Sequence, residues 1–130
     1  MLRDCKSELT SLKDLLPVHS LEPGLYLVAT PLGNPLDLGL RALQVLQAVS
    51  RIAAEDTRVS QQLLSTFGIS KPLISYHSYN ADQRDAELVA LIQNGESLAL
   101  ISDAGMPLIS DPGSSLVTAC VEAGLHVTVI

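Results

Sequence analysis

The chain has 130 residues, 47% apolar and 17% charged, so it is one domain long enough to bury a core. The formal charge is −6 and the eight Lys and Arg residues are scattered, so no basic patch argues for nucleic-acid binding. The two cysteines form no CxxC or Cys/His cluster, which supports neither a metal site nor a disulfide framework. No apolar run is long enough for a membrane span or a secretory signal. We expect a cytoplasmic protein that binds no metal.

The first part of the chain divides into an extension and the start of a domain. Residues 1–22 are expected to be an N-terminal extension, and residues 23–130 an α/β domain. A buried strand is predicted over 25–29, because this run is continuously apolar. The loop 30–37 is rich in turn residues and leads into a helix. Apolar residues at helical spacing in that helix are Leu40, Leu43, Leu46 and Val49.

The middle of the chain repeats the alternation of strand and helix twice. Strands are predicted at 51–54 and over 73–76. Asp56 is placed to cap the helix that follows the first of them. The run Asn80-Ala-Asp-Gln83 has the spacing of a capping box and predicts the start of the next helix.

The last part is centred on the loop 102–113. A short buried strand at 98–101 enters this loop, and a helix over 114–123 and a strand over 126–130 follow it. The alternation predicts an α/β fold with a doubly wound, mainly parallel five-stranded sheet and helices on both faces. Because the chain stops on a strand, we expect it to be the N-terminal domain of a longer protein.

Three loops leave the carboxyl ends of predicted strands, at 30–37, 55–58 and 102–113. This is the edge at which open α/β sheets bind ligands. The charged side chains that these loops bring to the edge include Glu55, Asp56, Arg58 and Asp103. Neither a Walker A loop nor a G-x-G-x-x-G motif occurs, so phosphate or dinucleotide binding lacks its usual motif. The residues alone predict an acidic cleft for a small polar ligand.

Each of these residues also has a purely structural interpretation. Asp56 is a candidate helix cap, and Arg58 is spaced to pair with Glu55 on the same helix face. His77 follows a strand alone and fits a surface or hydrogen-bonded histidine better than a catalytic base. Asp111-Pro-Gly113 has the pattern of a helix start. The sequence leaves both interpretations open.

Four stretches match a known family in order and at natural spacing. They are Gly24–Asn34, Ala54–Arg58, Phe67–Ile69 with Pro72–His77, and Ser102–Gly105 with Pro107–Gly113. Together they cover about residues 23–130. On these residues the chain resembles the N-terminal half of the ribosomal RNA methyltransferases of the tetrapyrrole methylase superfamily.

The resemblance implies a two-domain, typically homodimeric enzyme. It would transfer a methyl group from S-adenosylmethionine to the ribose 2′-oxygen of a decoding-region cytidine in the 16S rRNA of the small ribosomal subunit. The cofactor contacts that the resemblance implies are Leu32, Asp103, Ala104, Gly105 and Met106. The substrate-facing residues that it implies are Thr30, Pro31, Gly33 and Asn34, with Glu55, Asp56, Thr57 and Arg58. We expect this half to be inactive alone.

The catalytic base is left open. The attacking hydroxyl must lose a proton, and Asp56, Arg58 and Asp103 are the catalytic candidates, with Glu55 and His77 as further acid–base residues. Two other functions stay open. One is a methylase of the same superfamily that acts on a tetrapyrrole, another small molecule or a protein. The other is a non-catalytic α/β binding domain.

Overall fold

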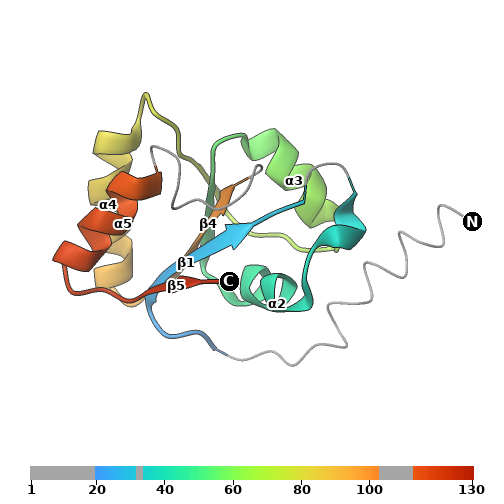
Figure 1. The fold of residues 1–130 in the computed structure, drawn as a ribbon, viewed down its shortest axis with the longest axis horizontal. Coiled ribbons are helices and arrows are strands. Elements are labelled where there is room, and N and C mark those ends of the chain that lie inside the picture. Colours follow the sequence, from blue (N-terminus) through green and yellow to red (C-terminus); the bar gives the residue numbers. More distant parts are fainter. Residues whose placement is uncertain (1–19, 32–33, 103–112) are drawn as a thin grey trace, which may run out of the picture.

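The fold is a single parallel sheet, seen in a computed structural model that describes residues 20–31, 34–102 and 113–130. The strands are β1 (Gly24–Ala29), β2 (Arg51–Ala54), β3 (Leu73–Ser75), β4 (Ser97–Ser102) and β5 (Val127–Val129). They lie in the order β3-β2-β4-β1-β5, and every neighbouring pair is parallel. Figure 1 labels β4, β1 and β5 of this sheet. The predicted parallel five-stranded sheet is therefore confirmed. Most of the expected extension lies outside the described residues.

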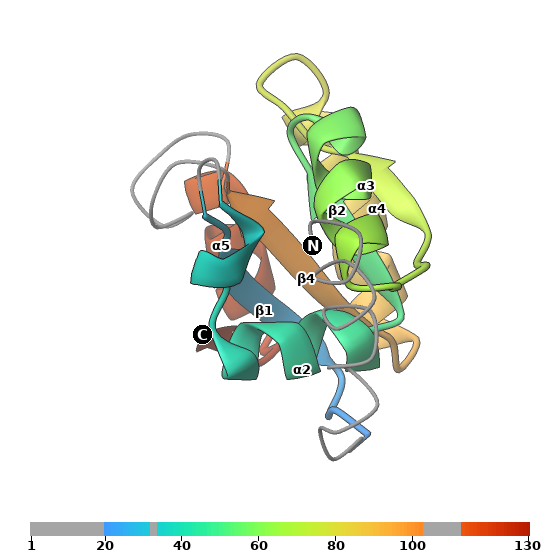
Figure 2. The ribbon, with the colours of Figure 1, turned by 90° about the vertical axis from the view of Figure 1, so that its right-hand side faces the viewer.

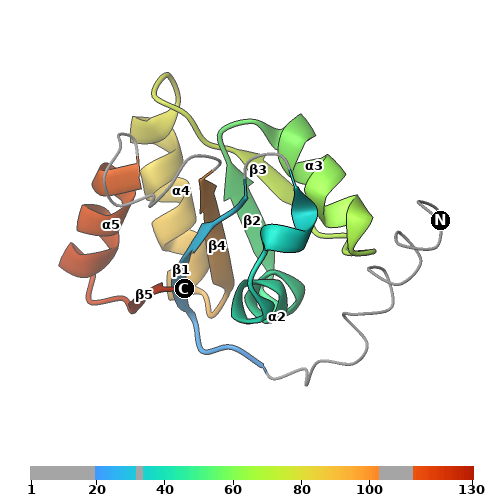
Figure 3. The same cartoon turned by 45° about the vertical axis from the view of Figure 1, so that its right-hand side comes forward.

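Helices cover both faces of this sheet. They are α2 (Leu40–Ala48), α3 (Thr57–Thr66), α4 (Ala81–Gln93) and α5 (Gly113–Glu122), with a 3₁₀ turn η1 (Pro35–Asp37). Figure 3 shows α2 and α3 on one side of the strands and α4 and α5 on the other. Because both faces are covered, the doubly wound arrangement that the sequence predicts is also confirmed.

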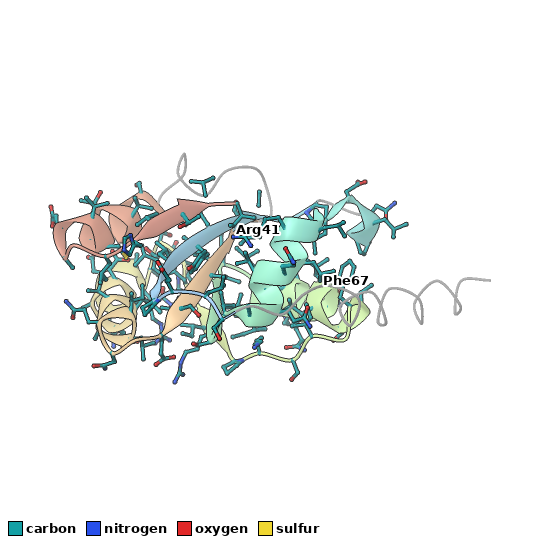
Figure 4. The ribbon with its side chains drawn as sticks, turned by 90° about the horizontal axis from the view of Figure 1, so that it is seen from below. Arg41 and Phe67 are labelled. Atoms are coloured by element: carbon teal, nitrogen blue, oxygen red, sulfur yellow. The ribbon has the colours of Figure 1, made fainter. Side chains whose placement is uncertain are left out.

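The two sides of β1 enter two separate cores. Tyr26 and Val28 pack on the α2–α3 side, and Leu25 and Leu27 pack on the α4–α5 side. Successive strand residues point to opposite faces, so a strand buried on both faces must be apolar throughout. Phe67, which is 2% exposed, closes the α2–α3 core at the end of α3 (Figure 4). The continuous apolar run in the sequence thus has a direct structural cause.

One local prediction is wrong, and a second is confirmed for the start of the helix but not for the capping bond. Leu40 was expected on the buried face of its helix, but it is 57% exposed, because α2 begins at this residue and its buried positions start only at Ala42. Asn80 stands at the N-cap of α4 but makes no side-chain capping bond. Its amide instead accepts the His77 N–H at 2.9 Å and donates to the Ser75 carbonyl at 3.1 Å. These bonds compete with the capping box for the same side chain.

Candidate functional site

Two of the three expected site loops follow neighbouring strands, β1 and β4. These neighbours run side by side (Figure 2), but the chain leaves β1 towards α2 on one face and leaves β4 towards α5 on the other. Connections that leave neighbouring strands on opposite faces can leave a crevice at the carboxyl edge of the sheet, the edge at which open α/β sheets bind their ligands. Thr30 and Ser102, which stand at the carboxyl ends of these two strands, therefore border the candidate site.

A pair of hydrogen bonds joins the two strands where these loops begin. The buried Thr30 donates both its backbone N–H and its hydroxyl to the Ser102 carbonyl, each at 3.0 Å. Ala29 and Ser102 are the last register partners of β1 and β4. The expected site residues Leu32 and Gly33, and Asp103, Ala104, Gly105 and Met106, lie outside the described residues. Their roles stay predictions.

The described remainder of the first loop packs towards α3. Asn34 caps η1, since its Oδ1 accepts the Leu36 N–H at 3.0 Å. Pro31 and Pro35 line a small hollow of about 240 Å³ together with Val59 and other residues of α3. Asn34 therefore has a local structural task in addition to its expected position facing the substrate.

The second expected substrate loop lines a larger hollow at the same edge. The residues Glu55–Arg58, which join β2 to α3, face His77, Ser78 and Tyr79 after β3 across a hollow of about 680 Å³. The structure therefore brings together the Glu55–Arg58 loop and the loop of His77. Both follow neighbouring strands, as parallel pairing of β2 and β3 requires.

Asp56 has the capping role that the sequence predicts. Its Oδ1 accepts the backbone N–H groups of Arg58 at 3.0 Å and Val59 at 3.4 Å. The expected pairing of Arg58 with Glu55 is not seen, and within the described ranges the guanidinium of Arg58 forms no salt bridge. Arg58 is exposed. A fixed carboxylate and an exposed cation thus stand at the start of α3.

His77 is held by its own turn. Its Nδ1 accepts the Tyr79 N–H at 3.2 Å, and its Nε2 lies 3.3 Å from the Asn80 side-chain amide. The Tyr79 ring also stands edge-on to the imidazole at 6.0 Å. Both ring nitrogens therefore have neighbours inside the turn, which favours the structural interpretation of this histidine over that of a base.

A second, larger hollow adjoins the first. Its volume is about 810 Å³, and Thr57 and Arg58 belong to the walls of both. Gln61 and Gln62 of α3 form one side, Leu73, Ile74 and Ser75 of β3 form the floor, and Arg84 of α4 closes it. The sequence analysis did not identify this hollow. Arg84 is 26 residues from Arg58 in the chain, and only the packing of the helices brings the two to one surface.

A hydroxyl–carboxylate cluster of Tyr76, Asp85 and Ser115 was also missed by the sequence prediction. Asp85 of α4 accepts the hydroxyl of Tyr76 at 2.5 Å and that of Ser115 at 2.7 Å. Burial and the hydrogen bond to Asp85 raise the pKa of Tyr76 far above its usual value. Burial raises the pKa of the fully buried Cys120 to about 11, which keeps this thiol protonated at neutral pH. The cluster joins the end of β3 to α4 and to the first turn of α5.

Neither a metal site nor a membrane helix is seen in the described segments. No three His, Cys, Asp or Glu side chains gather there as metal ligands would. No helix among those residues is long and apolar enough to cross a bilayer.

Comparison with known proteins identifies relatives across most of the chain. A family model described as tetrapyrrole (corrin/porphyrin) methylases matches residues 24–130. A protein named "Ribosomal RNA small subunit methyltransferase I" from Mesorhizobium japonicum is 50% identical over 88% of this chain and 39% of its own length. Proteins of the same name from Synechocystis and Escherichia coli O157:H7 are 55% and 53% identical over 79% of this chain. The chain spans between 36% and 39% of the length of these three relatives.

Solved structures share the fold at lower identity. A uroporphyrin-III-C-methyltransferase from Thermus thermophilus superposes with a TM-score of 0.65 and 24% identity, over 83% of this chain and 47% of its own. A cobalt precorrin-4 methyltransferase gives 0.64 with 14% identity, over 82% of this chain and 44% of its own. At such identities the superpositions describe the architecture only.

Proposed function

This chain belongs to the tetrapyrrole (corrin/porphyrin) methylase family, and we propose that it is the N-terminal part of an S-adenosylmethionine-dependent methyltransferase that acts on small-subunit ribosomal RNA. The observation that carries the proposal is the identity of 50–55% to three proteins named for that activity, over 79–88% of this chain. The acceptor we propose is the ribose 2′-hydroxyl of a decoding-region cytidine in 16S rRNA.

We place the cofactor at the carboxyl ends of β1 and β4. S-adenosylmethionine supplies an electrophilic methyl group on a sulfonium cation, and the protein that would hold it carries a net charge of −6. Thr30 and Ser102, joined by hydrogen bonds at the ends of these strands, would border the cofactor. The residues proposed to hold the cofactor are Leu32, Asp103, Ala104, Gly105 and Met106.

The substrate would enter from the side of β2 and β3. The loop of Thr30, Pro31, Gly33 and Asn34 and the loop of Glu55, Asp56, Thr57 and Arg58 are the proposed walls. Positioning of the hydroxyl would supply much of the acceleration, and a carboxylate would accept its proton. Asp56 and Asp103 fit the latter role. The planar guanidinium of Arg58 suits it to orient an anionic group.

Assembly and location complete the proposal. We propose a cytoplasmic homodimer that binds the small ribosomal subunit, with a second domain supplying the opposite side of the cofactor crevice. This chain of 130 residues would then be inactive alone.

Tritium transfer from S-adenosylmethionine to isolated 30S subunits tests this proposal. The full-length gene product should label the RNA, and nuclease digestion should yield 2′-O-methylcytidine. A label on uroporphyrinogen or on ribosomal protein, with none on RNA, would favour the alternative acceptors. Calorimetry with S-adenosylhomocysteine checks the cofactor separately, and absence of binding would favour a non-catalytic domain.

A further inference from the structure

We propose that the 810 Å³ hollow between α3, β3 and α4, here called the arginine groove, binds backbone phosphates of the RNA substrate. This inference rests on the proposed function. It extends the proposed RNA contact from Thr57 and Arg58 to Gln61, Gln62, Ser75 and Arg84, which lie outside the two loops already proposed to face the substrate. The groove is defined by Thr57, Arg58, Gln61 and Gln62 of α3, Ser75 of β3 and Arg84 of α4.

The charge of the groove is opposite to that of the chain. The protein carries a formal charge of −6. The only ionisable side chains among the described residues that line the groove are the two arginines. The amides of Gln61 and Gln62 add neutral hydrogen-bond donors on the exposed face of α3. Such a wall fits an extended polyanion, which arginine and amide groups bind through phosphate oxygens.

Arg58 is placed where its charge does not stabilise the fold. It lies in the first turn of α3, where the helix dipole disfavours a cation. It is exposed and forms no salt bridge within the described part of the chain. An arginine at a helix position that disfavours a cation, with no contact that stabilises the fold, is a candidate for binding a ligand. Phosphate would supply the missing partner.

Arg84 is held in place by its backbone contact. Its Nε donates to the Ser75 carbonyl at 3.1 Å, which fixes the side chain against the edge strand β3. Its Nη1 donates to Glu87 at 2.7 Å, in a pair whose side chains are 34% and 44% exposed. Exposed pairs of this kind are weak. The remaining N–H groups of the guanidinium are preorganised for a planar, bidentate anion.

The groove continues from the proposed substrate entrance. Thr57 and Arg58 belong to its wall and to the wall of the hollow formed by Glu55–Arg58 and His77–Tyr79. A strand of RNA whose reactive ribose lies at the carboxyl edge of the sheet would therefore run its neighbouring phosphates along α3 towards Arg84.

Arg84→Gln and Arg51→Gln form a matched pair of variants. Arg51 forms a salt bridge with Glu96 at 2.8 Å, much as Arg84 does with Glu87. Arg51 is the first residue of β2, whereas the groove lies beside α3, which follows the last residue of that strand. Fluorescence anisotropy of the full-length gene product with a fluorescein-labelled single-stranded RNA, in the presence of S-adenosylhomocysteine, measures the Kd. We expect Arg84→Gln to raise it about 5- to 10-fold, the effect of one partly exposed charge-assisted hydrogen bond. Arg51→Gln should leave it unchanged.

The salt dependence tests for phosphate directly. One lost phosphate contact should reduce the slope of log K against log salt by about 0.7 for single-stranded RNA. Methylation of 30S subunits should show a raised KM for RNA with unchanged kcat, and the Kd for S-adenosylhomocysteine should not move. Polyglutamate of equal charge serves as a control. If polyglutamate bound the wild type as tightly as the RNA does, and if Arg84→Gln weakened its binding by the same factor, the assignment to phosphate would be overturned.

A second pair of variants protects the test against a folding defect. Gln61→Glu places a carboxylate in the groove from an exposed helix position, and Gln93→Glu places one at the exposed end of α4. Only the former should weaken RNA binding. If the wild type methylates RNA while Arg84→Gln and Gln61→Glu bind it as the wild type does, the inference fails and the proposed function stands. If RNA binding depends on the groove but no RNA is methylated, the proposed function fails and the inference stands.

Discussion

Replacing Tyr76 by Phe should remove a stabilising contribution that disappears in alkali. The Tyr76 hydroxyl donates to Asp85 at 2.5 Å and lies 3.3 Å from the Ser115 hydroxyl, and the tyrosine itself is 2% exposed. Loss of a buried hydroxyl bound to a carboxylate costs about 1–2 kcal/mol of unfolding free energy near neutral pH. Folding has a second effect on Tyr76, because it raises the pKa of the phenol above the value in the unfolded chain.

The sign of the pH effect follows from that shift. A raised folded pKa means that the fold favours the neutral phenol, so the contribution is complete below the unfolded pKa of 10.0 and is lost as pH rises above it. One pH unit above that value, titration of Tyr76 should have lowered the unfolding free energy of the wild type by about 1.4 kcal/mol. Tyr76→Phe has no phenol at this position, so its unfolding free energy should not fall for this reason. The two proteins, different at neutral pH, should therefore be of nearly equal stability at about pH 11.

Urea unfolding followed by far-UV circular dichroism measures this gap at each pH. Tyr79→Phe is the matched control, since Tyr79 is 97% exposed and should give no gap at any pH. Cys120 also faces the cluster, but it titrates in both proteins and so cancels in the difference. A gap between the wild type and Tyr76→Phe that stays constant from neutral pH to about pH 11 would refute the reasoning.

Three further variants or reagents test other features. Gly24→Ala would place a Cβ 2.9 Å from the His126 carbonyl oxygen between β1 and β5, and should lower the unfolding free energy by about 1–3 kcal/mol; an unchanged urea midpoint would contradict this. Asp56→Ala should cost about 1 kcal/mol through loss of the α3 cap, whereas Asp56→Asn should keep that stability; if Asp56→Asn nevertheless lost kcat, a proton-accepting role would be supported. In a Cys5→Ser background, Cys120 should resist a thiol reagent at neutral pH until urea unfolds the chain, and rapid labelling of that native protein would contradict the burial of Cys120.

The sheet was predictable because its strands are buried on both faces. The strand at Arg51–Ala54 has the predicted bounds, and Gly68 ends α3 with a positive φ of 70° as a C-terminal glycine should. Such signals lie within a few residues of one another. The strand order cannot be predicted from such local signals, because it depends on which distant strands pair. Only the structure shows that β1 and β4 are neighbours.

The candidate site was predictable only in part, for the same reason. The cap at Asp56 is a local pattern and was correctly predicted. The contact of Tyr76 with Asp85 and Ser115 joins residues 9 and 39 positions away, which meet because α4 and α5 pack side by side. The arginine groove likewise needs α3 and α4 to meet at β3. Hydrophobic periodicity carries no information on either.

The two hydrogen bonds from Thr30 to Ser102 also limit what a ligand can do in the crevice. A carbonyl oxygen has two lone pairs, and the Ser102 oxygen receives both the N–H and the hydroxyl of Thr30, each at 3.0 Å. The end of β4 is thus saturated as an acceptor by the protein itself. A ligand amine or hydroxyl that enters between β1 and β4 must find its acceptors farther out, on the loops. Selectivity at this edge is therefore a property of the loops, and the same sheet can serve different ligands when the loops change.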